Sequence, residues 1–134
     1  ELPLEEMLPA PGQGALAIEV RRSDGDALAS VAKINVAKSA ACTLAERTLL
    51  SELHGGCLAP IAALGTIEES GDSATLGLNA RDLSVDGTDC LEAQSDVAIE
   101  LEYDAWKSAA ESLGKRVSVS LIEQGARALI ESGR

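Results

Sequence analysis

The sequence predicts an α+β domain built from a three-stranded antiparallel sheet with helices packed on one face. Three features support this fold class. Apolar residues recur with helical spacing over about 37–53, strand patterns bounded by turns cover 58–100, and apolar residues stay on one face of a single helix over about 104–124. A strand and a short helix over 15–33 precede this domain. We therefore divide the chain into residues 1–36 and a C-terminal domain of residues 37–134.

The N-terminal part combines a connector with two short elements. Residues 1–14 hold three of the four prolines and two glycines, a composition typical of an extended connector. Residues 15–20 are mostly apolar and predict a strand. The turn at 23–26 can cap a short helix from Asp26 to about Ile34.

The helix over about 37–53 carries an apolar stripe at spacings of three and four: Ala41, Cys42, Ala45, Leu49 and Leu53. The segment His54-Gly55-Gly56 ends this helix and offers a glycine for a left-handed cap. Glu46 and Arg47 lie away from the centre of the stripe, which fits a solvated pair or a contact with another domain.

The C-terminal domain continues with three strands and two helices. The strands are expected at 61–67, 74–83 and about 89–95, with hairpin turns at Ser70-Gly71-Asp72 and Asp86-Gly87. One long helix follows over about 104–124, because its apolar residues keep one phase through Gly114, and a short helix ends the chain at 126–132.

Composition excludes several classes of function. The net charge of −11 argues against nucleic acid and anionic membranes as partners, since both require a basic surface. The three cysteines show no CxxC spacing, so neither a zinc site nor a disulfide framework is indicated. No apolar run approaches about 20 residues, so no membrane span is expected. These features indicate a cytoplasmic protein with free thiols.

Cys57 has the most unusual setting of the three thiols. It follows Gly55-Gly56 at a helix–strand junction, where a thiol can be exposed and a bulky covalent adduct can fit. The alternative is a small structural residue at this junction. The C-terminus of the preceding helix carries partial negative charge, which disfavours a thiolate and raises the pKa of a thiol beside it. The positive charge that would activate Cys57 must therefore come mainly from elsewhere.

The local pattern leaves two other hypotheses open. The chain fits a non-catalytic α+β binding or assembly module with structural cysteines, in which Cys42 is a small core residue and Cys90 is incidental. It also fits, less well, a cysteine-nucleophile enzyme, but His54 is the single histidine and has no evident orienting carboxylate.

Three segments together resemble the porphobilinogen deaminases (hydroxymethylbilane synthases). Residues 8–19 read LPAPGQGALAIE and resemble the family's LPAxGQGAxxIE segment. Ala45-Glu46-Arg47 followed by residues 53–60, LHGGCLAP, resembles its AER…LxGGCxxP cofactor loop, with His54 where an acidic residue is often found. Residues 125–130, GARALI, resemble its C-terminal GAxxIL. The order and spacing agree over essentially the whole chain.

The resemblance implies a three-domain protein of which this chain is the C-terminal portion. Residues 1–36 would be a remnant of the preceding domains: residues 9–14 a hinge that places Gln13 near the active cleft, and residues 15–33 a strand and helix of the first domain. Residues 37–134 would be the cofactor-carrying third domain.

The resemblance also implies a transferase of tetrapyrrole and heme biosynthesis that condenses four porphobilinogen molecules into hydroxymethylbilane. Its dipyrromethane cofactor would be thioether-linked to Cys57, with Gly55, Gly56 and Gln13 as the other cofactor-binding residues. A soft sulfur nucleophile suits this chemistry, because it can trap the electrophilic azafulvene that loss of ammonia leaves. The family's catalytic aspartate and carboxylate-binding arginines belong to the first two domains. We therefore expect no catalytic residue, no activity and no cofactor in this chain without its N-terminal domains.

Overall fold

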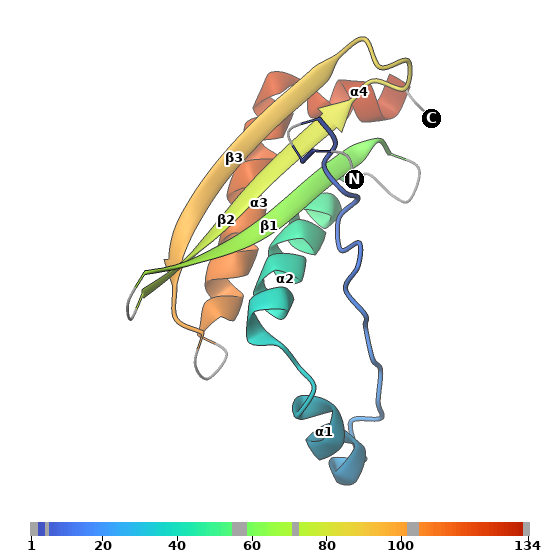
Figure 1. The fold of residues 1–134 in the computed structure, drawn as a ribbon. Helices are drawn as coiled ribbons and strands as arrows, with labels where there is room; N and C mark the ends of the chain where they lie inside the picture. Colours follow the sequence, from blue (N-terminus) through green and yellow to red (C-terminus); the bar gives the residue numbers. More distant parts are fainter. Residues whose placement is uncertain (1–2, 5, 55–58, 71–72, 102–104, 133–134) are drawn as a thin grey trace.

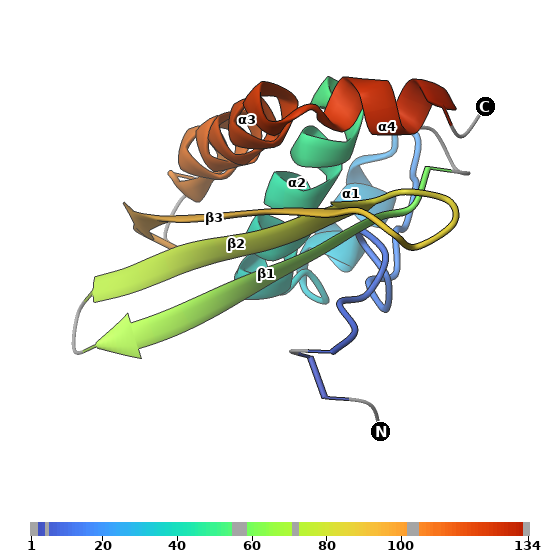
Figure 2. The same ribbon diagram turned by 90° about the horizontal axis from the view of Figure 1, so that it is seen from above.

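The structure, a computed structural model, describes residues 3–4, 6–54, 59–70, 73–101 and 105–132. It confirms the predicted fold class, an antiparallel three-stranded sheet with helices on one face (Figures 1 and 2). The elements in chain order are α1 (Gly25–Ala32), α2 (Ala37–Glu52), β1 (Ile61–Ser70), β2 (Ser73–Leu83), β3 (Cys90–Ile99), α3 (Trp106–Gln124) and α4 (Ala126–Ser132).

Strand β2 lies at the centre of the sheet, in the order β1-β2-β3. Near its C-terminal end, Asp82 lies opposite Ile61 of β1 and Leu91 of β3. Successive side chains of a strand point to opposite faces, and alternate residues of β2 are buried on the helix side: Ala74, Leu76, Leu78, Ala80 and Asp82. The sheet therefore has one face covered by helices and one open face, as Figure 2 shows.

The β2–β3 hairpin confirms the turn predicted at Asp86-Gly87. Gly87 has a φ of 74°, a left-handed value that glycine adopts without strain. The Asp86 carboxylate accepts hydrogen bonds from the Ser84 hydroxyl at 2.7 Å and the Thr88 N–H at 3.1 Å. These bonds, the Ser84 bond above all, lower the pKa of the Asp86 carboxyl. The turn thus fixes the register that places Asp82 opposite Leu91.

Helices α2 and α3 pack against each other and against the sheet. The apolar stripe predicted for α2 is buried at Ala41, Ala45, Leu49 and Leu53, whereas Cys42 is half-buried. Helix α2 lies very close to α3 at Gly114, where an added Cβ would lie 2.5 Å from the Ala45 carbonyl oxygen. Gly114 is therefore required by the helix crossing.

We predict that Gly114→Ala destabilises the protein, although alanine favours a helix over glycine by about 1 kcal/mol. The added Cβ would meet backbone atoms of α2, and overpacking of this kind costs about 1–3 kcal/mol or more. Chemical denaturation should show a lower free energy of unfolding. The control is Gly25→Ala at the start of α1, where an added Cβ meets nothing within 4 Å. Equal or higher stability of the Gly114 variant would contradict the packing.

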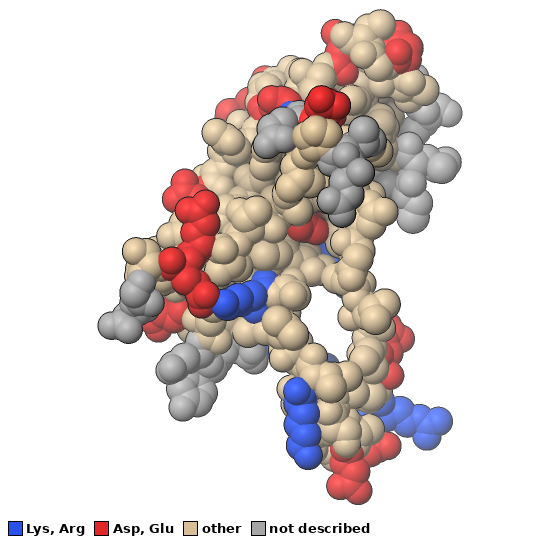
Figure 3. Space-filling view, in the orientation of Figure 1, with Lys and Arg blue, Asp and Glu red and all other residues tan. Residues whose placement is uncertain are grey.

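Residues 13–36, here called the N-terminal excursion, leave the domain and return at α2 (Figure 1). Helix α1 confirms the predicted short helix but has no buried residue, and Leu16 is 96% exposed. The strand predicted at 15–20 is not formed, because no strand among the described residues pairs with this segment. Figure 3 shows an opening between the excursion and the rest of the molecule.

Candidate functional site

The predicted cofactor loop lies outside the described residues, so Cys57, Gly55 and Gly56 stay predictions as site residues. The structure does describe both ends of this loop. One end is the C-terminus of α2 and the other is the N-terminus of β1. The geometry of these ends, and of the groups around them, defines the candidate site.

Helix α2 ends in a buried residue followed by a left-handed one. Leu53 is 2% exposed, and its N–H donates to the Leu49 carbonyl at 3.1 Å. His54 has a φ of 53°, and its N–H donates to the Ser51 carbonyl at 3.1 Å. The glycines predicted for a left-handed cap, Gly55 and Gly56, lie outside the described residues. His54 itself takes a left-handed conformation, at a cost of about 1–2 kcal/mol. The chain therefore leaves α2 from a fixed and partly strained point.

The other end of the loop is held by the sheet. The Pro60 carbonyl accepts the N–H of Leu83 at 3.1 Å, and the next residue, Ile61, begins β1. Ile61 is 5% exposed and lies opposite Asp82. Leu53 and Ile61 therefore anchor a short connection at the end of the sheet where β2 terminates.

A buried glutamate joins the predicted hinge to the domain. Glu46, in the middle of α2, is 7% exposed. Its Oε2 accepts the N–H of Gly12 and its Oε1 accepts the N–H of Gly65, each at 2.7 Å. The predicted solvated Glu46–Arg47 pair is therefore wrong for Glu46, because two backbone N–H groups hold its carboxylate inside, whereas Arg47 is exposed.

The hinge segment runs along the free edge of β1. The Pro9 carbonyl accepts the N–H of Ala63 at 3.0 Å, three residues before the Gly12–Glu46 bond. Gly12 and Gly14 have φ values of 74° and 87°, which glycine adopts readily. The segment thus covers an edge that would otherwise expose unpaired backbone groups.

Gln13 is exposed and bonds within its own turn. Its side-chain oxygen accepts the N–H of Ala10 at 3.2 Å, and its N–H donates to the Ala10 carbonyl at 3.0 Å. Its neighbour Gly12 is bound to Glu46, which lies about 10 Å along the α2 axis from Leu53. The structure does not bring Gln13 to the ends of the cofactor loop, and its predicted contact with the cofactor stays a prediction.

The sequence analysis missed Asp82. This carboxyl is 0% exposed on the helix-covered face of β2, and neither of its oxygens has a hydrogen-bond partner. Burial raises the pKa of Asp82 from its usual 3.8 to about 6. The strand pattern could have predicted the burial of Asp82. Alternate residues of a strand share a face, and Asp82 shares the face of the buried Leu76, Leu78 and Ala80.

The two described thiols differ in their surroundings. Cys42 is half-buried beneath Gly65, and its thiol pKa is raised by burial and, to a lesser extent, by the Glu46 carboxylate. Cys90 is exposed at the start of β3. Within the described part of the chain, no group of His, Cys, Asp and Glu side chains could hold a metal ion. None of the helices described here is long and apolar enough to cross a membrane.

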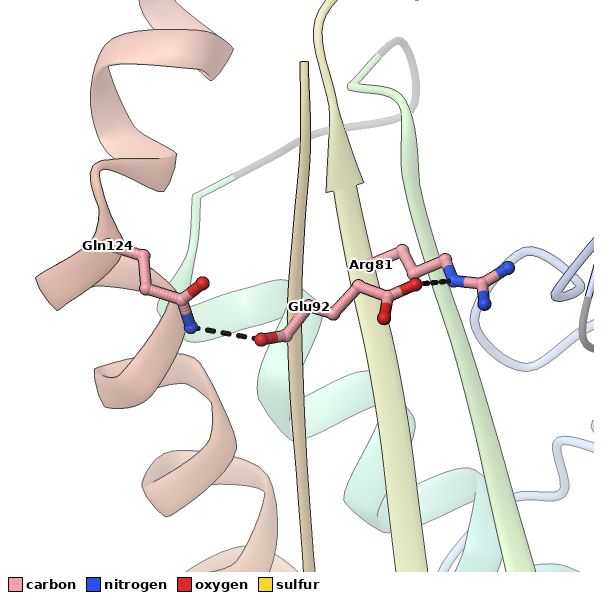
Figure 4. Close-up of polar contacts among 3 residues, drawn as sticks. All are labelled: Arg81, Glu92 and Gln124. Carbon is pink, nitrogen blue, oxygen red and sulfur yellow. Dashed lines mark hydrogen bonds and ion pairs between the residues drawn. The ribbon is translucent and has the colours of Figure 1, made fainter.

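Several basic side chains of the domain are already bound within it. Lys38 pairs with Glu69 at 2.5 Å, and the Arg116 side chain donates to the Ser95 hydroxyl and the Asp96 carbonyl. Figure 4 shows Arg81 paired with the Glu92 carboxylate, whose backbone carbonyl accepts the Gln124 side-chain amide at 3.0 Å. These side chains stabilise the sheet and its helices.

The open face of the sheet carries a hollow of about 790 Å³. Its walls mix apolar and polar side chains of the sheet and of the N-terminal segment, among them Leu4, Leu8, Leu64, Thr66, Asn79 and Arg81. Of the predicted site residues, the structure describes Gln13, which does not line this hollow.

Comparison with known proteins gives a consistent result. Residues 40–123 match the family model described as porphobilinogen deaminase, C-terminal domain. The chain is 38% identical to a porphobilinogen deaminase of Nocardia farcinica over 93% of its length, and 38% identical to one of Eremothecium gossypii over 94%. One of Mycobacterium leprae is 39% identical over 96% of the chain. The chain spans 35%, 37% and 40% of the lengths of these three relatives.

Proposed function

Since the chain belongs to the porphobilinogen deaminase family, whose C-terminal domain it matches, we propose that it carries the pyrrole cofactor of the complete enzyme on Cys57. The complete enzyme would condense four porphobilinogen molecules into hydroxymethylbilane. This chain would contribute the attachment thiol, and the domains that it does not span in its relatives would contribute the catalytic aspartate.

The observation that carries this proposal is the pair of fixed anchors around the loop. Leu53 is buried at the end of α2, and the Pro60 carbonyl is bonded to Leu83 in the sheet. Anchors of this kind limit where a thiol between them can lie, and defined placement of a reacting group is what covalent catalysis requires. The two glycines before Cys57 add no side chains at its approach.

The residues present offer a thiol for attachment of a dipyrromethane and acceptors for its N–H groups. The cations that would bind its carboxylates are left to other domains. A thiol suits a stable thioether bond, and Asp82, opposite Ile61 at the start of β1, has unpartnered oxygens that can accept N–H groups. When bound, the cofactor supplies a nucleophilic pyrrole carbon. Lys38, Arg81 and Arg116 are bound within the domain, so we propose that the cations for its carboxylates come from the missing domains.

We also propose that the N-terminal excursion docks on those domains. It exposes Leu16, Ile18, Leu28 and Ile34, and α1 buries none of its residues against the domain. An unpaired extended segment and an amphipathic helix both gain stability when another surface covers them. Glu46 would hold the start of this segment in place through its bond to Gly12.

The proposal predicts that activity requires both the missing domains and Cys57. The chain alone, mixed with porphobilinogen, should release no hydroxymethylbilane. A fusion that places the N-terminal domains of the Mycobacterium leprae relative before this chain should be active. Cys57→Ser should abolish that activity, and Cys90→Ser, an exposed thiol at the start of β3, should preserve it. Activity of the Cys57→Ser fusion would overturn the role of this thiol.

A further inference from the structure

The sheet has two outer edges, on β1 and on β3, whose backbone groups can pair with a further strand. The β1 edge is occupied, because the Pro9 carbonyl accepts the N–H of Ala63 and the Glu46 carboxylate accepts the N–H of Gly65. At β3, no further strand among the described residues continues the sheet. The β3 edge is therefore the place where a strand from another chain can be added.

The hydrogen bonding of the β2–β3 hairpin shows which backbone groups face this edge. The Ser84 N–H donates to the Asp89 carbonyl at 2.9 Å, so the backbone groups of Asp89 point toward β2. In an antiparallel pair, successive residues point their backbone groups alternately toward and away from the partner strand. The N–H and carbonyl groups of Glu92, Gln94 and Asp96 therefore point outward, where an added strand would bind them.

Two long side chains of α3 occupy the outward carbonyls of β3. The Arg116 side chain donates to the Asp96 carbonyl at 2.8 Å and to the Ser95 hydroxyl at 3.0 Å. The Gln124 side-chain amide donates to the Glu92 carbonyl at 3.0 Å, as Figure 4 shows. The two side chains start about 12 Å apart along the axis of α3, and the two carbonyls lie about 13 Å apart along β3, so one helix serves both. A strand that joined β3 would have to displace both side chains.

Residues 15–20 of a second copy have the properties of a strand that fits this edge. In its own molecule this segment lies beyond β1, on the other side of the sheet from β3 (Figure 1), and pairs with no described strand. Leu16 and Ile18 are 96% and 57% exposed and would share one face of a strand, because alternate residues do. The helix-side flank of β3 offers Leu91 and Val97, which are half-buried. Pairing would therefore cover apolar groups of both copies.

We propose that the β3 edge is a pairing surface for residues 15–20 of a second copy, and that Arg116 and Gln124 hold this surface closed. A joining strand would exchange the two existing hydrogen bonds for its own, so it gains little while both side chains are bound. The chain therefore stays monomeric although it exposes an unpaired apolar segment. This inference goes beyond the proposed function, because it involves no residue of the cofactor loop and holds whatever Cys57 carries.

The test is sedimentation velocity of the chain at concentrations up to about 1 mM, where weak association becomes visible. The variant Arg116→Ala/Gln124→Ala opens the edge, and its dimer dissociation constant should be at least about tenfold below that of the wild type, which is about 1.4 kcal/mol. The matched control is Lys115→Ala/Ser112→Ala, which also removes one cation and one neutral polar group from exposed positions of α3. The control should sediment as the wild type does.

A further pair of substitutions separates strand pairing from association of misfolded chains. Ala17→Pro/Ile18→Pro, added to the edge-opening variant, removes two adjacent N–H groups, one of which must face β3 in any strand pairing. Both residues are exposed, so the domain should fold unchanged and the wild-type dissociation constant should return. Hydrogen exchange should show protection of residues 15–20 and 92–98 in the dimer alone. An edge-opening variant that associates no more than the control would overturn the closing role of the two side chains. A dimer that persists with both prolines would overturn residues 15–20 as the partner.

Discussion

Glu46→Ala is expected to lower the free energy of unfolding by about 3 kcal/mol or more, since hydrogen bonds to a charged group contribute about 1.5–3 kcal/mol each. The carboxylate accepts the N–H groups of Gly12 and Gly65 at 2.7 Å, and it is 7% exposed. Its removal would leave the Gly65 N–H unpaired at the edge of β1 and release the hinge from α2. Equilibrium denaturation in urea measures the loss.

Two further variants separate the hydrogen bonds of Glu46 from its charge and its packing. Glu46→Gln keeps one oxygen acceptor but presents an NH₂ group to the second N–H donor, so it should lose about half as much stability as the alanine variant. Glu52→Ala removes an exposed glutamate from the last turn of the same helix and should change stability by less than about 0.5 kcal/mol. Equal stabilities of the Glu46 and Glu52 alanine variants would show that the bonds to Gly12 and Gly65 contribute nothing.

Asp82→Asn is expected to stabilise the protein at neutral pH by up to about 3 kcal/mol. The pKa of Asp82 is raised by burial from 3.8 to about 6, and this shift corresponds to about 3 kcal/mol at 1.36 kcal/mol per unit. Because the folded state holds the proton more tightly, the contribution of Asp82 is fully present below pH 4 and is lost as the pH rises through 6. An asparagine carries no charge at any pH.

The pH dependence of unfolding distinguishes this mechanism from a general change in packing. The difference in stability between Asp82→Asn and the wild type should be small at pH 3.5, grow between pH 4 and 6, and level off above pH 7. Asp96→Asn, which replaces an exposed acid, should follow the wild-type curve. A difference that is the same at pH 3.5 and pH 7.5 would contradict the burial of an ionisable Asp82.

Most of the fold followed from residue periodicity. The apolar stripe of α2, the continuous phase of α3 through Gly114 and the turn at Asp86-Gly87 are local signals, and each predicted element of the C-terminal domain was confirmed within a few residues. The strand predicted at 15–20 was wrong, because a strand needs a partner and its apolar pattern could not show whether one was present. Local pattern therefore identified elements, but not their pairing.

The sequence predicted less of the site because its central contacts are long-range. Glu46 is buried by N–H groups 34 and 19 residues away, and no local pattern reveals such partners. His54 takes a left-handed conformation, which the sequence pattern predicted for a glycine and not for a histidine. Asp82 was predictable in principle, because its parity in β2 places it among buried residues. Its position opposite Ile61, at the start of β1, depends on strand pairing that the local pattern does not show.

The attachment of the cofactor to Cys57 is tested most directly by peptide mapping of the active fusion. Trypsin separates Cys42, Cys57 and Cys90 into the peptides 39–47, 48–81 and 82–107. We predict that peptide 48–81 carries a dipyrromethane adduct on Cys57 in the fusion and is unmodified in the chain alone. An active fusion with an unmodified Cys57, or with the adduct on another cysteine, would contradict the account.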